Sequence, residues 1–209
     1  MINKLFAATL LAGLATANAD AKAVEKITIG NTNTVVRTVT GTLAGDLREL
    51  SLKDDIYHNE LIETGSDSAT EISFLDDTIL TVGANAVLVL DKFIYDPDPS
   101  RASFVLTATA GVFRFASGTL PKKAYTIHTP TATIGIRGTV FTVAVQTVDE
   151  PGSIGRVAVS VTVEEGEVDI VSCGGERIHL DSVTPSVTIS GDVSDLCHAY
   201  AAVDPQPAD

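Results

Sequence analysis

The chain has little material for a bulky aromatic core. Among its 209 residues there is no tryptophan and one methionine, and aromatic residues make up only 5% of the sequence. Hydrophobic residues still account for 44%, so valine, isoleucine, leucine and a few phenylalanines must fill the interior. Side chains of this modest volume suit narrow layers of β-strands.

Basic residues and long apolar runs are also scarce. Lysine and arginine number 14 against 27 acidic residues, a formal net charge of −13. Such a surface repels nucleic acid and anionic lipid, so we expect no nucleic-acid partner. No stretch reaches the roughly 18 consecutive apolar residues of a transmembrane helix, so we also expect no membrane span.

The first residues have the pattern of a secretory signal. Lys4 precedes an apolar run from Leu5 to Ala17, and Ala17-Asn18-Ala19 has the small-residue form read by signal peptidase. We predict a signal peptide at residues 1–19, with cleavage after Ala23 as the alternative. Without Lys4, 13 basic and 27 acidic side chains leave a net charge of −14. We expect the mature chain to be periplasmic or secreted.

Most of the remaining sequence alternates β-branched with small polar residues. Valines recur at every second position from Val157 to Val163, Glu165-Gly166 turns the chain, and Val168 and Ile170 resume the alternation. This pattern predicts a hairpin. Strands spaced by roughly ten residues are typical of an all-β sandwich, barrel or solenoid. We predict an all-β, solenoid-like stack of short strands and hairpins, with no substantial helix after the signal peptide.

The segment from Thr126 to Val145 is the most informative stretch, because it joins a glycine-containing bend to a cleanly alternating strand. Gly135 and Gly138 permit positive φ or close backbone approach on either side of Arg137. In a structural reading, Arg137 caps carbonyls at a corner or pairs with a buried carboxylate. In a functional reading, Arg137, Gly135 and Gly138 bind a ligand or partner, since a planar guanidinium with five donors suits either role.

Several motifs, in a consistent order, carry a family resemblance. They are VTGTL at 39–43, IETGSDSATEISFLDDT at 62–78, LVLDKFIYDP at 88–97, AGVFRFASG at 110–118, TPTATIGIRGTVF at 129–141 and VEEGEV at 163–168. Over residues 35–189 the chain resembles the FecR domain of bacterial envelope proteins.

The resemblance implies an all-β, solenoid-like periplasmic domain that takes part in protein recognition or signal sensing. The eponymous members of that family are sigma-factor regulators with a cytoplasmic N-terminal segment, a membrane helix and a C-terminal signalling module. The sequence shows none of these three parts. We therefore expect a stand-alone exported FecR domain, without an anti-sigma role.

Two turns depart from the family pattern at positions where it has glycine. The first is Asp77, in the turn Phe74-Leu75-Asp76-Asp77-Thr78, and the second is Asp54, in Asp54-Asp55. Aspartate tolerates left-handed turn conformations better than most residues, so we expect both turns to survive.

Both cysteines, Cys173 and Cys197, lie near the end of the chain. An exported chain with two cysteines is expected to pair them, and we predict a Cys173–Cys197 disulfide. It would tie a C-terminal extension at residues 190–209, which ends in a flexible tail, to the domain. A nucleophile built from Cys197 and His198 is the alternative, but adjacent residues of a strand point to opposite faces.

The sequence offers little for catalysis or metal binding. No G-x-S-x-G elbow occurs, and no metal-binding spacing links the four histidines, His58, His128, His179 and His198. Asp91, Asp96 and Asp98 form a weak calcium candidate, with a solvated acidic turn as the alternative. We expect no cofactor.

Two further side chains are candidates for recognition. Arg114 alternates with Phe113 and Phe115, which places it on the solvent face of their strand, where it is either a binding residue or an ordinary solvated arginine. Tyr95 lies beside the acidic turn.

We interpret the chain as a non-enzymatic exported FecR-domain protein, a protein-recognition or signal-sensing module of the bacterial cell envelope. Its partner would be another envelope protein or a surface glycan, docked on a strand edge or a broad sheet face. The alternatives are a carbohydrate-active enzyme and a structural domain of a surface assembly, each on a β-solenoid scaffold.

Overall fold

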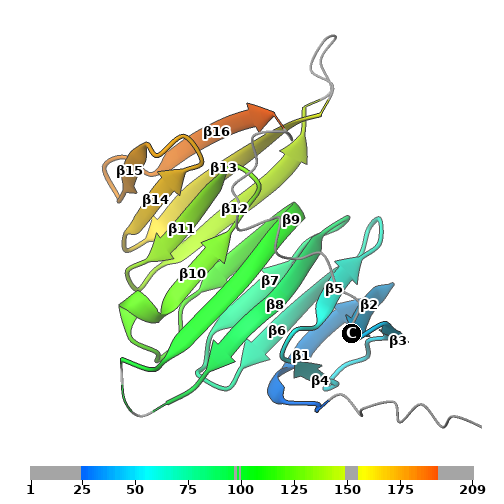
Figure 1. The fold of residues 1–209 in the computed structure, drawn as a ribbon. Helices are drawn as coiled ribbons and strands as arrows, with labels where there is room; N and C mark the ends of the chain where they lie inside the picture. Colours follow the sequence, from blue (N-terminus) through cyan, green and yellow to red (C-terminus); the bar gives the residue numbers. More distant parts are fainter. Residues whose placement is uncertain (1–24, 97, 99, 149–154, 193–209) are drawn as a thin grey trace, which may run out of the picture.

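The computed structural model describes residues 25–96, 98, 100–148 and 155–192. In this part of the chain, sixteen strands form one continuous open sheet that folds over at its centre into two layers (Figure 1). A single turn of 3-10 helix, η1 (Lys122–Ala124), is the one helical element of these residues. The predicted all-β fold of short strands and hairpins is confirmed, while solenoid winding stays a prediction.

The two layers share one long strand, β9 (Ser103–Ala116). In order across the first layer, layer A, lie β4 (Asp55–Tyr57), β1 (Thr28–Val36), β6 (Ala69–Phe74), β7 (Ile79–Val82), the second part of β9, β12 (Val140–Thr147), β13 (Arg156–Glu165) and β16 (Ser186–Asp192). In order across the second, layer B, lie β3 (Asp46–Glu49), β2 (Val39–Leu43), β5 (Leu61–Thr64), β8 (Val87–Ile94), the first part of β9, β10 (Tyr125–His128), β11 (Ala132–Ile136), β14 (Val168–Ser172) and β15 (Arg177–Leu180).

The change of layer within β9 occurs at Gly111. Residues before it pair with β8 and β10, and Gly111 and the residues after it pair with β7 and β12. Gly111 has φ +100°, and a side chain at this position would overlap Ala86. Glycine is therefore required for the bend.

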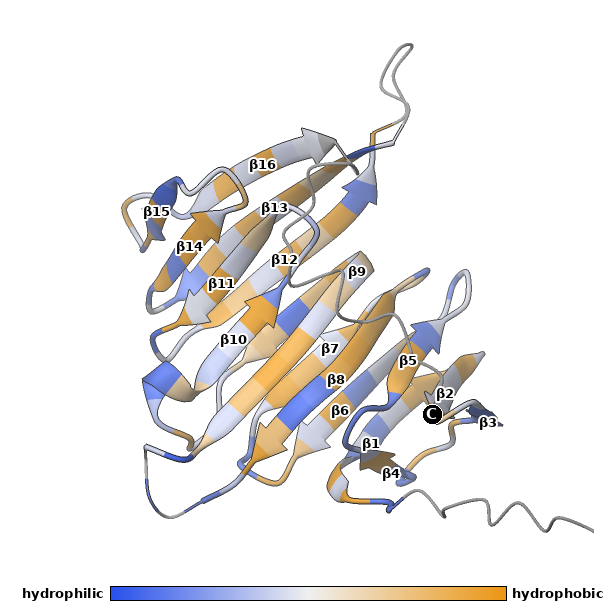
Figure 2. Cartoon of the chain, viewed as in Figure 1, coloured by the Kyte–Doolittle hydropathy of each residue, from blue (hydrophilic) through white to orange (hydrophobic). Residues whose placement is uncertain are grey.

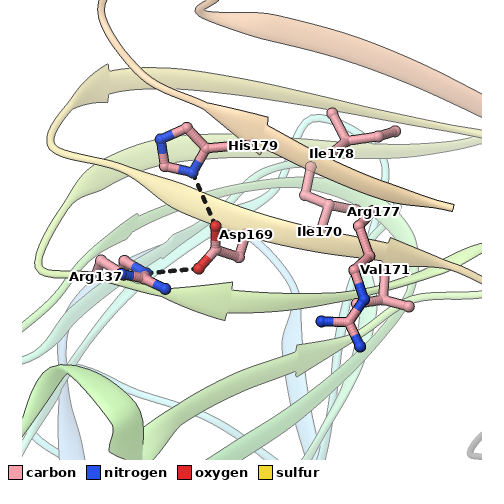
Figure 3. A pocket seen from close by; sticks show the side chains of 7 residues that line it. All are labelled: Arg137, Asp169, Ile170, Val171, Arg177, Ile178 and His179. Atoms are coloured by element: carbon pink, nitrogen blue, oxygen red, sulfur yellow. Dashed lines mark hydrogen bonds and ion pairs between the residues drawn. The ribbon is translucent and has the colours of Figure 1, made fainter.

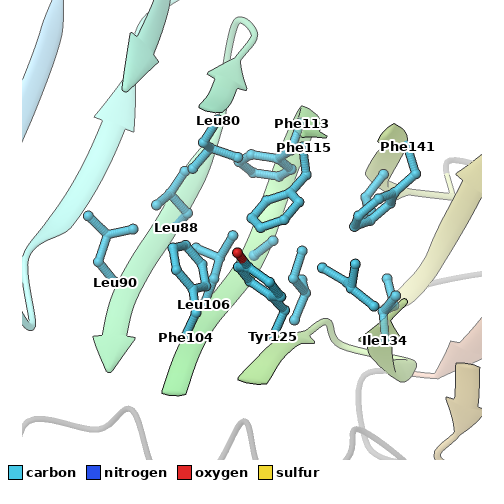
Figure 4. Packing of buried hydrophobic residues seen from close by; sticks show 14 of the residues in the cluster. Leu80, Leu88, Leu90, Phe104, Leu106, Phe113, Phe115, Tyr125, Ile134 and Phe141 are labelled. Carbon is cyan, nitrogen blue, oxygen red and sulfur yellow. The ribbon is translucent and has the colours of Figure 1, made fainter. Parts of the chain in front are cut away.

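Alternating side chains build the core between the layers. Along β6 and β13, buried residues alternate with exposed or half-buried ones, and Figure 2 shows the matching alternation of hydropathy on β13. Six aromatic rings connect the layers across this core, with neighbouring centroids 4.9–6.0 Å apart: Phe74, Phe93, Phe104, Phe115, Tyr125 and Phe141. Figure 4 shows the last four of these rings packed together. The scarce aromatic residues are thus concentrated at the centre of the fold.

The predicted hairpin at Glu165-Gly166 is wrong. β13 pairs with β12 and β16 in layer A, whereas β14 pairs with β11 and β15 in layer B. The turn is a corner that takes the chain from one layer to the other. The bend at Gly138, between β11 and β12, is a second such corner directly beside it, because a side chain on Gly166 would overlap the Gly138 carbonyl.

A buried carboxyl group ties the two layers together. Asp76, in the turn between β6 and β7, is fully buried, and its Oδ2 accepts hydrogen bonds from Tyr125 OH and Thr78 Oγ1, each at 2.7 Å. Tyr125 belongs to layer B, so this contact crosses the core. The Tyr125 hydroxyl in turn accepts a hydrogen bond from the backbone amide of Leu120, with 3.1 Å between nitrogen and oxygen. Burial, followed by the adjacent Asp76, raises the pKa of Tyr125 and keeps its hydroxyl a donor.

Several predicted features lie outside the described residues. These are the signal peptide at 1–19, Cys197 with its disulfide to Cys173, His198, and the tail that ends the 190–209 extension. The pairing therefore stays a prediction. The domain boundaries at 35 and 189 lie within the described residues and also stay predictions. Within the described ranges, no helix has the length and apolar character that a bilayer crossing requires.

Replacing Tyr125 with phenylalanine tests the contact between the layers. Tyr125→Phe leaves the ring packing in place but removes a donor from buried Asp76, so we expect the free energy of unfolding to fall by about 2 kcal/mol. Urea denaturation followed by circular dichroism measures the change. Tyr95→Phe is the matched control, because Tyr95 is 60% exposed and should change stability by less than about 0.5 kcal/mol. Equal stabilities of the two variants would contradict this role for Asp76.

Candidate functional site

A shallow pocket lies on the outer face of layer B, close to the edge of the layer that β15 forms. Its volume is about 250 Å³. Seven residues from the end of β11, from β14 and from β15 line it (Figure 3): Arg137, Asp169, Ile170, Val171, Arg177, Ile178 and His179. The pocket therefore joins Arg137, predicted from the sequence, to residues that follow it by more than thirty positions.

Strand alternation places the charged residues on this outer face. On β14, Val168 and Ile170 are buried against the core, so Asp169 between them points outward. On β15, Leu180 is buried and His179 is exposed. The pairing register sets His179 directly opposite Asp169, which brings the two side chains together.

Asp169 is the centre of the charged cluster. Its Oδ2 accepts a hydrogen bond from Arg137 Nε at 2.5 Å, and its Oδ1 lies 2.8 Å from His179 Nδ1. The hydrogen bond from His179, together with the Arg137 guanidinium, holds the pKa of Asp169 below its usual range. The same hydrogen bond raises the pKa of His179. The two shifts favour an ionised carboxylate beside a protonated imidazole.

Both arginines of the pocket keep free donors. Arg137 reaches Asp169 through Nε alone among the described residues, so its two Nη groups are available. Arg177 is exposed, and no side chain in the described part of the chain pairs with its guanidinium. A guanidinium with an open fork is suited to a carboxylate or a phosphate. The pocket can therefore receive an anionic group.

The predicted backbone conformation of the bend around Arg137 is found at one of its two glycines. Gly138 has φ +75°, so one of the two glycines does adopt the left-handed region. Gly135 does not, and a side chain there would meet only the Asp169 carbonyl at 3.6 Å, an ordinary contact. Arg137 pairs with a carboxylate, as the structural reading expects, but the Asp169 side chain is 42% exposed rather than buried.

The remaining predicted binding residues lie elsewhere. Arg114 is on the outer face of layer A, where its guanidinium pairs with Glu164 at 2.9 Å, and this pairing lowers the pKa of Glu164. Tyr95 follows β8 and is exposed. Neither residue lines the pocket, and their binding roles stay predictions.

The structure does not bring Asp91, Asp96 and Asp98 together as metal ligands. No group of three potential ligands occurs among the described residues. Asp96 and Asp98 pair with Arg101 at 3.5 and 3.4 Å, and the amide and hydroxyl of Ser100 lower the pKa of Asp98. Asp91 lies in β8 instead, where burial raises its pKa.

Sequence reasoning missed Asp169, Arg177 and His179. Each alternates with buried or half-buried apolar residues, which is a visible signal that it faces outward. Their convergence with Arg137 depends on two pairings, β11 with β14 and β14 with β15. Alternation does not specify which strands pair.

The fold and the pocket define an all-β domain of two layers with a small charged site on one outer face. The family model described as "FecR protein" matches residues 60–169, just over half of the sequence. The chain therefore belongs to the FecR family. A search of curated proteins found no match.

Three solved structures are similar to parts of the chain. One, described as "Cell surface anchoring domain", has a TM-score of 0.28 and 29% identity, over 29% of this chain and 82% of that one. Two others are described as a "putative anti-sigma factor" from Parabacteroides distasonis, each with a TM-score of 0.45 and with 14% and 16% identity over 64% of this chain. This chain spans 61% of the length of each of those two. At these TM-scores we draw no conclusion from the three similarities.

The contact between Asp169 and His179 predicts a dependence on pH. The raised pKa of His179 means that its stabilising contribution is present below the unfolded value, about 6.5, and is lost as the pH rises through the folded value. The lowered pKa of Asp169 means that its contribution is lost as the pH falls below about 4. The pair should therefore stabilise the fold most between these limits.

An NMR titration of the imidazole signals measures this effect. We expect Asp169→Asn to lower the pKa of His179, because the charged acceptor is lost. An unchanged His179 titration in the variant would show that the contact with Asp169 has no part in the shift.

Proposed function

We propose that the protein is a non-enzymatic, exported recognition module of the cell envelope, which binds another envelope protein at the pocket around Arg137, Asp169 and His179. Membership of the FecR family supports a role in recognition or signal sensing. The signal-like sequence of residues 1–19 supports export to the periplasm or beyond.

The main support for the proposal is that the pocket holds Arg137 in place while leaving guanidinium donors free. Asp169 holds Arg137 through Nε and leaves both Nη groups free to bind a partner. A second guanidinium, that of Arg177, lines the same pocket. Half-buried Ile178 and partly exposed Val171 add apolar surface beside these charges. Cationic forks next to apolar surface are typical of protein recognition.

The electrostatics of the pocket also favour binding over acid–base catalysis. A general base works best when its pKa lies near the operating pH. The neighbours of Asp169 move its pKa in the opposite direction, away from neutrality. Glycoside hydrolysis needs a second carboxyl group within about 10 Å across the substrate. Asp169 is the one carboxylate that lines this pocket.

Affinity capture from envelope extract tests the proposal. The mature chain, residues 20–209, is immobilised as wild type, as Arg137→Gln and as Arg37→Gln. The last is a matched control, because Arg37 is also exposed and paired with a carboxylate, that of Asp67, but lies between β1 and β2 and does not line the pocket. We expect one envelope protein to bind the wild type and Arg37→Gln, and binding to Arg137→Gln to fall about tenfold, as for the loss of one charge-assisted contact.

Circular dichroism of all three proteins establishes that each is folded. Capture of the same protein at equal strength by Arg137→Gln would remove the pocket from the binding surface. Failure of the wild type to bind any envelope protein, together with release of sugar from cell-wall polysaccharide, would replace the proposal with the carbohydrate-active alternative.

A further inference from the structure

We propose that the open edge of β15 receives an extended acidic segment of a partner protein as an added strand, whose carboxylates bind Arg177 and Arg137. The inference rests on the proposed recognition function and specifies its partner chemistry. Two independent features of the same edge carry it: the direction of its backbone groups and the placement of its free cations.

The backbone of β15 presents unpaired donors and acceptors. Among the described residues, β15 pairs with β14 alone. In an antiparallel pair, hydrogen-bonded and non-hydrogen-bonded positions alternate. The Ser172 amide donates to the Glu176 carbonyl at 2.9 Å where the hairpin closes. Counting from that bond, Arg177 and His179 occupy non-hydrogen-bonded positions, so their amides and carbonyls point away from β14 toward the open edge.

The side chains of the same two residues lie on the outer face, at the pocket. An incoming strand that pairs with Arg177 and His179 would set every second side chain on this face, about 5 Å from β15. Acidic side chains there would meet the Arg177 guanidinium first and the free Nη groups of Arg137 beyond it. The alternate side chains of the strand would face inward beside half-buried Ile178, so they should be apolar.

The other strand edges of the sheet fit such a partner less well. β4 has three residues. β3 has four residues, as β15 does, but its Arg48 is directed to fully buried Glu60 and to the Asp55 carbonyl. β16 is longer, but its sequence SVTISGD contains no basic residue. Free guanidinium groups and an open edge therefore coincide at β15.

The proposed partner segment is a short run that alternates glutamate or aspartate with β-branched residues. Charge complementarity is local, because this chain as a whole carries a net charge of −13. A flexible acidic chain would be repelled over most of the surface. An extended segment in the register of β15 would meet Arg177 and, two residues further along, His179.

A fluorescent peptide provides the test. The probe is a capped peptide of about eight residues with alternating glutamate and valine, a typical strand length. Binding to the full mature chain is followed by fluorescence anisotropy at neutral pH. Two matched probes separate the contribution of charge from that of strand pairing. One has lysine in place of glutamate. In the other, the backbone nitrogens that would donate to β15 are methylated. An oligoglucuronate chain represents an acidic glycan.

We expect the glutamate peptide to bind the wild type and Arg37→Gln equally, and Arg177→Gln about tenfold more weakly, the size of one lost charge-assisted contact. The lysine peptide and the methylated peptide should bind at least tenfold more weakly than the parent. Arg177→Gln is exposed on an edge strand, so circular dichroism should show an unchanged fold.

Four outcomes would overturn the inference. Equal binding of the methylated and parent peptides would show attraction between charges without strand pairing. Undiminished binding by Arg177→Gln would place the peptide elsewhere, and tighter binding of oligoglucuronate than of the peptide would identify an acidic glycan as the ligand. Capture of an envelope protein that depends on Arg137 but not on Arg177 would leave the proposed function standing while refuting the added strand at β15.

Discussion

The structure depends on one buried carboxyl group, that of Asp76. An unpaired polar group in an apolar core costs free energy, so the surrounding chain must supply hydrogen-bond donors. Thr78 does so from the same turn, and Tyr125 does so from the opposite layer. The Asp76 carbonyl accepts the Thr119 amide at 2.7 Å, which fixes the segment that leads from β9 toward β10. One residue thus links the two layers and holds the segment between β9 and β10 against the turn that follows β6.

The connections that follow β6, β9, β11 and β13 are joined to one another by hydrogen bonds. The Gly118 amide donates to Thr78 Oγ1 at 3.0 Å, the Thr139 amide to Ser117 Oγ at 3.0 Å, and Thr139 Oγ1 to the Glu165 carbonyl. These bonds link the Asp76 turn, which stays within layer A, to the crossing after β9, that crossing to the one at Gly138, and the Gly138 crossing to the Gly166 corner. Arg137 lies one residue before Gly138 in this series of connections. Its position on the outer face therefore follows from contacts made in the interior and at the edge.

Part of this arrangement could be read from the sequence and part could not. The alternation that predicts strands also predicts which side chains are buried, because side chains of a strand point to opposite faces. The turn at Asp77 survives as expected, with φ +66°, whereas in the second departure the left-handed residue is Lys53, with φ +68°, and not Asp54. The partners of each strand were not predictable. Val157–Val163 and Val168–Ile170 have one pattern but belong to different layers, so the expected hairpin was wrong and the cluster around Asp169 was missed.

The charge distribution explains how this cluster can bind anions selectively in an acidic protein. Over distances longer than the Debye length of about 8 Å, an anionic partner experiences mainly the net charge, which salt screens. At contact, it experiences individual guanidinium groups. Arg48 and Arg114 are committed to Glu60 and Glu164, and Asp169 engages only one nitrogen of Arg137. Long-range repulsion combined with a few free short-range donors discriminates against anions that cannot match their positions. Selectivity at this surface then arises from geometry, which an extended strand in fixed register supplies and a flexible polyanion does not.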